Sequence, residues 1–524
     1  MYNRFLVGII SGVILLVGLI TTSSASANKN KQSSTKVGFH HYTITAPFKV
    51  SLPVIALDLI VDETSSVDEL IVIGEDDANQ TWLAAYVFNE KANDFVLLDK
   101  LALTEEYFAF DVSENKGALY FLAKNKVVSL KYNADFTVDN NVKSGLYLQN
   151  KQKVNSIFLL SESTFITKKD FIQDINNDGY DDIVLPDFDQ TNLWLSSSNH
   201  SEAFYQHLAI KTQVELDRGA IRFKPTKLYF VDLDLDKQQD IAWISKGYIN
   251  YFSQNQIGQF STEVKKIELA DSIYGLNWWN IKESDGENLD QSNLTHRAVE
   301  EVNDINGDGL PDVVVRFTQS FGVLDRTNDY EFYLGHFSEE GQLEIPKIPN
   351  TVIKAEGTLT GLKIIDVNKD GKLEVLVSSF KLSVSNVIGA LLSGGIDQNV
   401  LLFALNDENR YEEDPFLSKE VELSFSLTSG QSGQPIVLLS DVNGDGLLDL
   451  VLSSGREQLS LFLGSTSPKF ISRKASKYKV TLPKNGELFE SYDINNDGNK
   501  DFIMRYGRLD DKSMINKISI LLVK

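Results

Sequence analysis

Six nine-residue stretches of this chain place oxygen-bearing side chains at alternate positions, a pattern that favours binding of a hard divalent cation. The first stretch is DINNDGYDD, residues 174–182. Its candidate ligands at positions 1, 3, 5, 7 and 9 are Asp174, Asn176, Asp178, the backbone carbonyl of Tyr180, and Asp182. Gly179 at position 6 permits the positive φ that brings these groups together. Carboxylates this close repel one another unless a cation neutralises them, so the stretch predicts a calcium site.

Five later stretches repeat the pattern with small changes. They are DLDLDKQQD from residue 232, DINGDGLPD from 304, DVNKDGKLE from 366, DVNGDGLLD from 441 and DINNDGNKD from 493. The second loop departs from the others because Lys237 stands at position 6, although Asp232, Asp234, Asp236 and Asp240 are all present. Its site is therefore expected to be either distorted or satisfied in part by this lysine.

Apolar runs on both sides of the loops predict that each loop joins two β-strands. For example, GLKII precedes the loop at 366 and EVLVSS follows it, and DVVVRF follows the loop at 304. An EF-hand or dockerin needs helices around its loop and a bidentate acid three positions later, so the flanking strands exclude those classes.

Two upstream units have the same strand-loop-strand outline without the ligands. They are VIALDLIVDETSSVDELIVIG around Asp58 and YFAFDVSENKGALYFLA around Asp111, where Leu119 replaces the closing acid, and we predict that both are metal-free. Together these make eight units of about 60 residues, the size of a four-stranded propeller blade. The expected fold is all-β, a β-propeller with eight blades as the first choice and seven as the alternative.

The last unit lacks an obvious fourth strand, because DFIMRYG and KISILLVK are followed by the end of the given sequence. The N-terminal stretch HHYTITAP, residues 40–47, is expected to supply the missing strand and close the ring.

From about residue 43 onward the repeats resemble the FG-GAP or VCBS family, whose D-x-[DN]-x-DG-x-x-D loops bind calcium in the β-propeller of integrin α-chains and many bacterial surface proteins. The resemblance implies ligands at positions 1, 3, 5 and 9 and a carbonyl at position 7. Beyond the two loops already described, these would be Asp304, Asn306, Asp308, Leu310 and Asp312; Asp366, Asn368, Asp370, Lys372 and Glu374; Asp441, Asn443, Asp445, Leu447 and Asp449; and Asp493, Asn495, Asp497, Asn499 and Asp501. It implies about five or six structural Ca²⁺ ions.

Composition narrows the function classes. The formal net charge of −23 argues against nucleic acid as a partner, since such binding needs clustered Lys and Arg. An acidic surface that simply keeps the protein soluble is the alternative explanation of this charge. The chain has no cysteine, which excludes disulfides, thiol catalysis and zinc sites of the cysteine type.

The N-terminus predicts export. Residues 1–27 have a positive start at Arg4, an apolar run from Phe5 to Ile20 and an Ala25-Ser26-Ala27 cleavage site, which is typical of a signal peptide. An uncleaved membrane anchor is the alternative. Residues 28–42 would then be a flexible leader and 43–524 the propeller, in a periplasmic, cell-surface or secreted location.

No catalytic motif is recognisable in the sequence. The paired His40-His41 favours a strand or surface feature over a site. Asn277-Trp278-Trp279-Asn280 is either a platform for sugar rings or a wedge between blades. Three insertions are candidates for recognition, namely 283–301, the acidic 406–415, and the apolar 385–396, for which packed strand is the better explanation.

These features predict an exported, calcium-stabilised binding or adhesion module for an extracellular protein or glycan. A carbohydrate-active enzyme resembling a polysaccharide lyase is the alternative, and a structural envelope component is the second. Catalytic residues are not assigned, and a membrane partner is expected only if the N-terminal segment is retained.

Overall fold

In the computed structural model, Val37–Lys524 form one compact unit. The structure describes residues 36–60, 67–104, 107–113, 117–138, 141–160, 166–198, 202–217, 220–274, 294–322, 325–354, 357–380, 395–426, 431–466 and 470–524. The predicted signal peptide therefore lies outside the described residues. Among the helices of the described residues, none has the length and apolarity to cross a membrane.

The described chain is all-β apart from two short 3-10 helices, Ile157–Leu160 and Gly486–Leu488. The first three sheets follow in chain order. The first sheet contains β2 (Lys49–Val50), β3 (Ile55–Leu57), β4 (Glu69–Glu75), β5 (Thr81–Asn89) and β6 (Asp94–Ala102). The second sheet contains β7 (Tyr107–Val112), β8 (Leu119–Ala123), β9 (Lys126–Val138), β10 (Asn141–Lys153) and β11 (Thr167–Lys168). The third sheet contains β12 (Ile172–Gln173), β13 (Asp182–Pro186), β14 (Thr191–Leu195) and β15 (Phe204–Leu208).

A separate hairpin of β16 (Gln213–Asp217) and β17 (Ala220–Lys224) precedes the sheet of β18 (Tyr229–Val231), β19 (Asp240–Ser245), β20 (Tyr248–Phe252) and β21 (Lys265–Glu268). A ten-stranded sheet follows, made of β22 (Ile273–Tyr274), β23 (Leu294–Asn303), β24 (Asp312–Gly322), β25 (Asp325–Tyr333), β28 (Thr351–Ile353), β29 (Thr358–Ile365), β30 (Glu374–Phe380), β31 (Gly395–Phe403), β32 (Leu417–Ser426) and β33 (Gln431–Gly433). The small hairpin of β26 (His336–Phe337) and β27 (Leu343–Glu344) branches from it.

The last two sheets bring the chain back to its beginning. One contains β34 (Val437–Ser440), β35 (Asp449–Ser453), β36 (Gln458–Phe462) and β37 (Ser476–Lys479); the other contains β38 (Phe489–Tyr492), β39 (Asp501–Arg505), β40 (Lys517–Val523) and β1 (Phe39–Thr45).

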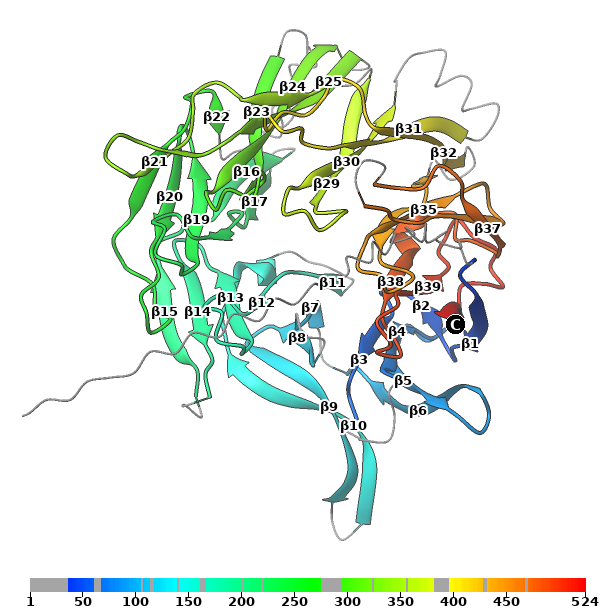
Figure 1. The fold of residues 1–524 in the computed structure, drawn as a ribbon. Coiled ribbons are helices and arrows are strands. Elements are labelled where there is room, and N and C mark those ends of the chain that lie inside the picture. The colour runs from blue at the N-terminus through cyan, green and yellow to red at the C-terminus, as the bar shows by residue number, and fades with distance from the viewer. Residues whose placement is uncertain are drawn as a thin grey trace, which may run out of the picture. The chain divides into compact units, whose positions relative to one another are not determined.

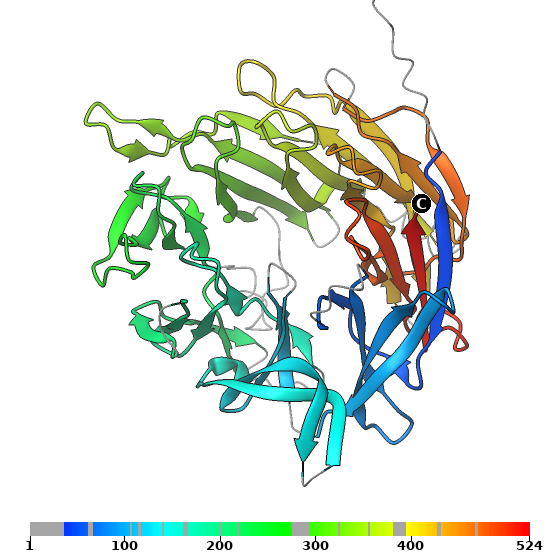
Figure 2. The ribbon, with the colours of Figure 1, turned by 60° about the horizontal axis from the view of Figure 1, so that its bottom comes forward.

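Successive sheets pack face to face through clusters of buried apolar side chains. Val184 of β13, for instance, shares a cluster with Ile241 and Phe252 of the next sheet. Eight such clusters occur in the described chain, and the series ends where β1, β39 and β40 pack against β4 and β5. The sheets therefore follow one another around a common centre, as Figure 2 shows, and the fold is a β-propeller.

The number of blades depends on how the ten-stranded sheet is divided. Its two halves meet at a single residue pair, Asn328 with Thr358. A buried cluster that includes Val314, Phe332 and Val375 also packs one half against the other, as in the neighbouring blades. Division at that pair produces eight blade-like groups in the described chain and no division produces seven, so the choice between eight and seven blades stays a prediction.

The first strand completes the last sheet, which confirms the expectation for residues 40–47. β1 pairs antiparallel with β40, with His40 opposite Leu522 and Ile44 opposite Ile518. This strand begins at Phe39, inside the stretch predicted as a leader. The side chains of His40 and His41 are exposed on it, as expected for a surface feature.

Ile44 tests whether this closure stabilises the ring. Its side chain is 3% exposed and packs with Ile518 and Ile520. We expect Ile44→Asp to lower the free energy of unfolding by about 3–5 kcal/mol, because it buries an unpaired charge in the seam. Urea denaturation measures this change. The control is Thr43→Asp, whose side chain is exposed and which should stay within about 0.5 kcal/mol of the wild type. Equal midpoints for the two variants would show that β1 does not stabilise the ring.

Candidate metal sites

Each of the six predicted loops connects two neighbouring antiparallel strands of a sheet. The loops lie between β12 and β13, β18 and β19, β23 and β24, β29 and β30, β34 and β35, and β38 and β39. The acid at position 9 is the first residue of the following strand in every case: Asp182, Asp240, Asp312, Glu374, Asp449 and Asp501. The flanking strands predicted from the sequence are therefore present in the structure.

The loops share one backbone conformation with positive φ at positions 4 and 6. At position 6, five loops have glycine with φ of 84° to 87°, and Lys237 has φ 74°. Position 4 also has positive φ, and is occupied by Asn177, Leu235, Gly307, Lys369, Gly444 and Asn496. Glycine reaches this region without strain, whereas other residues do so at a cost.

Hydrogen bonds inside each loop fix the positions of its side-chain oxygens. In the loop at 304, the Asp304 carboxylate accepts the backbone N–H groups of Asp308 at 3.2 Å and Gly309 at 2.8 Å. Asn306 Oδ1 accepts from Asp308 N, and Asp308 Oδ1 accepts from Leu310 N. The position-7 residues of the other loops make the same N–H contact with position 5: Tyr180, Gln238, Lys372, Leu447 and Asn499.

The position-9 acids are buried, and in five of the six loops the acid also connects the loop to the end of the third strand of its sheet. Asp312 is fully buried, its Oδ2 accepts the N–H of Ile305 at position 2 (2.9 Å), and its Oδ1 accepts the N–H of Gly335 (2.7 Å). Burial raises the pKa of Asp312 to about 7, and the nearby Asp308 and Asp304 charges add to the rise against the backbone hydrogen bonds. The pKa of Asp182 is raised to about 8, mainly by burial. A cation between these carboxylates would offset that cost.

Two buried carboxylate oxygens without a hydrogen-bond partner are suited to bind such a cation. Asp441 Oδ1 and Asp234 Oδ1 are buried and have no hydrogen-bond partner. In the described chain, one group of three acidic or histidine side chains has ligand atoms within 4.8 Å of one another, and it is Asp232, Asp234 and Asp240. The candidate metal ligands of the six loops are carboxylate, amide and carbonyl oxygens, which are the ligands that calcium prefers.

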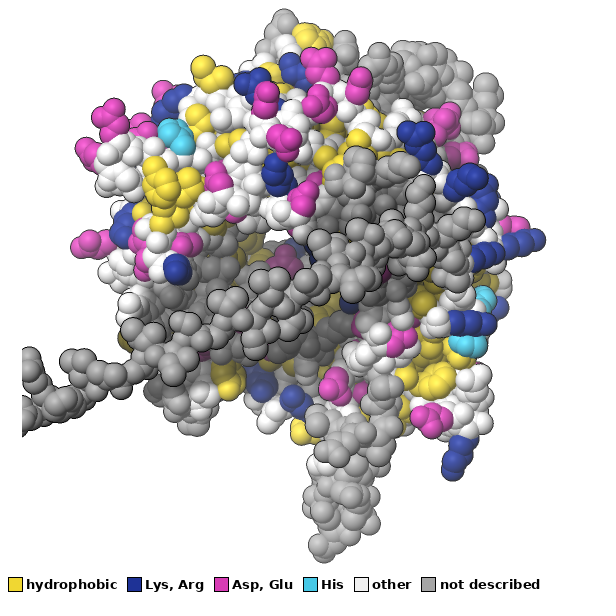
Figure 3. Space-filling model, in the orientation of Figure 1, with side chains coloured by type: hydrophobic (Ala, Val, Ile, Leu, Met, Phe, Trp, Pro, Cys, Tyr) yellow, Lys and Arg dark blue, Asp and Glu magenta, His cyan; other side chains and the backbone are white. Residues whose placement is uncertain are grey.

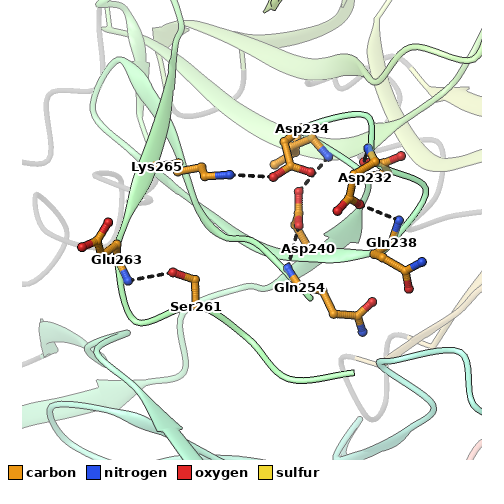
Figure 4. A network of polar contacts seen from close by, with 10 residues as sticks. Asp232, Asp234, Gln238, Asp240, Gln254, Ser261, Glu263 and Lys265 are labelled. Carbon is orange, nitrogen blue, oxygen red and sulfur yellow. Dashed lines mark hydrogen bonds and ion pairs between the residues drawn. The ribbon is translucent and has the colours of Figure 1, made fainter. Parts of the chain in front are cut away.

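The loop at 232 contains a built-in positive charge that the sequence did not reveal. Lys265, on β21, donates from Nζ to Asp234 Oδ2 at 2.6 Å, as Figure 4 shows. Lys237 was the expected partner. It instead takes the place of the turn glycine, and its backbone N–H donates to Asp232 Oδ2 at 2.7 Å. The backbone course of the other loops is thus kept, and a lysine from a neighbouring strand bonds one ligand carboxylate.

The two upstream units use single buried acids bonded to backbone N–H groups. Glu69 Oε2 accepts from Leu59 at 2.9 Å and Ile60 at 3.0 Å, and burial raises its pKa. Asp111 Oδ2 accepts from Phe171 at 2.7 Å and Ile172 at 2.8 Å. Parts of both loops, 61–66 and 114–116, lie outside the described residues, so their expected lack of metal stays a prediction.

A continuous series of hydrogen bonds, here called the loop relay, connects four loops. Ile305 N donates to Asp312, and the Ile305 carbonyl accepts from Leu373, position 8 of the next loop, at 2.9 Å. The remaining bonds are Val367 N to Glu374, Leu448 N to the Val367 carbonyl, Val442 N to Asp449, Lys500 N to the Asp441 carbonyl, Ile494 N to Asp501, and Asp68 N to the Ile494 carbonyl. Position 8 of the loop at 304 is Pro311, which has no N–H to donate to the preceding loop. The relay therefore starts there and ends at Asp68 beside Glu69.

The candidate recognition insertions are only partly described. Residues 277–280, 283–293 and 385–394 lie outside the described residues. The insertion at 406–415 forms a tight turn in which Asn406 Oδ1 accepts from Glu408 N and Arg410 N. Tyr411 is buried and its hydroxyl donates to the Leu373 carbonyl, while Glu412, Glu413 and Asp414 are exposed.

Comparison with known families matches the FG-GAP-like repeat to residues 304–377 and 441–504. The chain contains FG-GAP-like repeats. The two matched stretches hold the four loops of the relay, so these FG-GAP-like repeats are the part of the ring in which neighbouring loops are bonded in series.

A search of curated proteins found no match to the chain. Solved structures with a similar fold include a lectin of Agrocybe aegerita that recognises non-reducing terminal N-acetylglucosamine, with 13% identity, TM-score 0.36, and coverage of 82% of this chain and 94% of that one. They include the Vibrio cholerae biofilm matrix protein Bap1, with 11% identity, TM-score 0.37, and coverage of 93% and 90%. The WD40 domain of SCAP from fission yeast has 9% identity, TM-score 0.36, and coverage of 93% and 94%.

The loops differ in the backbone strain at position 6, and substitutions at this position test how much that strain costs in stability. Lys237→Gly should raise the free energy of unfolding by about 1 kcal/mol, because it removes a side chain from a positive-φ residue. Gly309→Ala should lower it by a similar amount, since φ is 84° and no atom lies within 4 Å of the added Cβ. Urea denaturation of both variants checks the pair. A loss of stability in Lys237→Gly would mean that the Lys237 side chain itself supports the loop.

Substitutions at Leu448, which is position 8 of the loop at 441, test the contribution of the loop relay to stability. Leu448→Pro removes the N–H that bonds the Val367 carbonyl, and Pro311 shows that position 8 accepts proline. Leu448→Ala removes the same side chain but keeps the N–H. We expect the proline variant to be about 1–3 kcal/mol less stable than the alanine variant by urea denaturation, because one buried carbonyl loses its partner. Equal stabilities would contradict a role for the relay.

Proposed function

We propose that this chain is an exported β-propeller whose loops bind calcium as structural ions, and that it serves as a binding module for an extracellular protein or glycan. The observation that carries the calcium proposal is the buried acid at position 9, which recurs at the same place in all six loops beside the side-chain oxygens of positions 1, 3 and 5. Asp441 Oδ1 and Asp234 Oδ1 support it, because each is buried without a partner.

A structural role for the ions fits the hydrogen bonds better than a catalytic one. In five of the loops the position-9 carboxylate joins the loop to the end of the third strand, as Asp182 does through Ser196 N at 2.7 Å. A cation that neutralises this carboxylate would therefore stabilise the strand order of the blade. At a free calcium concentration ten times the dissociation constant, each site contributes about 1.4 kcal/mol. Six sites would contribute as much as the stability of a typical domain.

Elements added to the ring support a binding role. The β9–β10 hairpin extends away from the neighbouring sheets, as Figure 1 shows. The β16–β17 hairpin exposes Val214 and Ile221, and the exposed Phe188 packs against its Phe223 with ring centroids 4.9 Å apart. Such additions on a rigid scaffold are where recognition is usually found. The N-terminal pattern of residues 1–27 supports export.

Calcium removal tests the proposal. We expect a chelator to lower the melting temperature by several degrees and calcium to restore it, while magnesium restores it less because its octahedral preference fits these loops poorly. Alanine at both Asp308 and Asp445 should reduce the response, whereas alanine at the exposed Asp189 should not. An unchanged melting temperature with chelator would refute structural calcium. Array binding to glycans and surface proteins with and without calcium tests the module role, and no signal on either would refute it.

A further inference from the structure

The loop at 232 differs from the other five loops in its charge at position 3. Asp234 stands at this position, whereas the other loops have an asparagine, namely Asn176, Asn306, Asn368, Asn443 and Asn495. Positions 1, 3, 5 and 9 of the loop at 232 therefore contain four carboxylates, and those of each other loop contain three. Four carboxylates in one loop repel more strongly than three, so this loop needs more positive charge than the others.

The asparagine of the other five loops forms two hydrogen bonds with position 5. In the loop at 304, Asn306 Nδ2 donates to Asp308 Oδ2 at 2.9 Å, and Asn306 Oδ1 accepts the backbone N–H of Asp308 at 3.1 Å. The same two bonds recur in the other four loops, where they are made by Asn176, Asn368, Asn443 and Asn495. A carboxylate at position 3 has no donor for the first of these bonds.

Lys265 supplies the missing donor in the loop at 232. Its Nζ donates to Asp234 Oδ2 at 2.6 Å, as Figure 4 shows. The other oxygen, Asp234 Oδ1, is buried and has no hydrogen-bond partner. The ion pair therefore occupies one oxygen of Asp234 and leaves the other for a cation. Four carboxylates and one ammonium group have a formal charge of −3, which equals that of the three carboxylates in each other loop.

The neighbouring strand positions Lys265, which stays partly exposed. Lys265 is opposite Tyr251 in the β20–β21 register, and its Nζ lies 5.7 Å from the centre of the buried Tyr251 ring. The side chains of Lys265 and Asp234 are 48% and 21% exposed. Figure 3 shows acidic and basic side chains intermixed on the surface over β19, β20 and β21. Because water and salt screen an ion pair with this exposure, its effect on cation binding is severalfold rather than many orders of magnitude.

We propose that Lys265 sets the calcium affinity of the loop at 232 by offsetting the charge of the extra carboxylate at position 3. The calcium affinity of such loops depends on the number of charged ligands. Without Lys265 the loop would be a four-carboxylate site, which binds calcium more tightly and is less stable without it. This inference rests on the proposed function, because it deepens the role of calcium in the ring. It gives control of one site to a residue outside the nine-residue loop.

A double-mutant cycle tests the affinity. Its members are the wild type, Lys265→Met, Asp234→Asn and the double variant, and calorimetric titration of each whole chain with calcium measures binding. We expect Lys265→Met to bind one calcium ion at least fivefold more tightly than the wild type, and Asp234→Asn to bind one at least fivefold more weakly. The double variant should lie within twofold of the wild type, because its ligand charge is again that of the other loops.

Melting temperatures in chelator test the same pair without calcium. We expect Lys265→Met to melt at a lower temperature than the wild type, because four carboxylates then lack any cation. The double variant should recover most of this loss, since an amide at position 3 donates to Asp236 as asparagine does in the other loops. If Lys265 acted only through its packing, both variants would lose the same stability and neither would change calcium affinity. That result would overturn the proposal.

Lys266→Met is the matched control. Lys266 is the next residue of β21 and is opposite Asn250, and its Nζ lies 5.4 Å from the centre of the Tyr248 ring. Adjacent residues of a strand point to opposite faces, so this variant removes an equal charge and a similar ring contact on the other face of the strand. We expect its calcium affinity to stay within twofold of the wild type. Equal gains in Lys266→Met and Lys265→Met would overturn a specific role for Lys265.

The outcomes separate this inference from the proposed function. If the wild type binds calcium and Lys265→Met binds it no more tightly, only the role of Lys265 fails. If neither chain binds calcium, the calcium proposal fails and the role of Lys265 fails with it.

Discussion

The architecture depends on one buried carboxylate in each repeat, the acid at the ninth position of the loop. It holds the N–H of position 2 on one oxygen and, in five of the six loops, the N–H of a residue at the end of the third strand on the other. A single side chain thus sets the loop, the start of the second strand and the end of the third. Burial raises the pKa of these acids, which is the free-energy cost of the arrangement. The repeats differ in how they offset it: the upstream unit bonds Glu69 to backbone N–H groups, and the loop at 232 adds Lys265.

Much of this site could be predicted from the sequence, because its ligands lie within nine residues and their spacing is a local property. The strands on either side and the closing N-terminal strand were predictable for the same reason, since alternating apolar runs are also local. Positive φ at position 4 was not predictable, because Asn, Leu, Gly and Lys all occur there and only the loop hydrogen bonds impose it. Lys265 and Gln254 reach the loop at 232 from other strands, and no spacing rule connects them to it. The role of Glu69 was missed because its loop is longer than the nine-residue pattern.

The blades are joined by two kinds of contact with different reach. Apolar clusters join every pair of neighbouring blades in the described chain, so each blade packs against both of its neighbours. The loop relay joins only the loops from 304 onward, because Pro311 has no N–H to offer the loop before it. Within the relay, the peptide group next to one position-9 acid bonds to the carbonyl of the preceding loop. The loops at 174 and 232 are connected by a longer side-chain contact, from Gln254 to the Ile175 carbonyl at 3.5 Å.

The pairing of β1 with β40 has a consequence for the order in which the molecule is made. The two strands are the first and last of the described chain, so their contact spans the largest sequence separation available and costs the most loop-closure entropy. During synthesis, β1 remains without its partner strand until β40 has been made. Its exposed edge is then open to pairing with another chain. The mostly polar side chains of β1, with Ile44 as its one buried residue, suit a strand that stays unpaired until its partner is made.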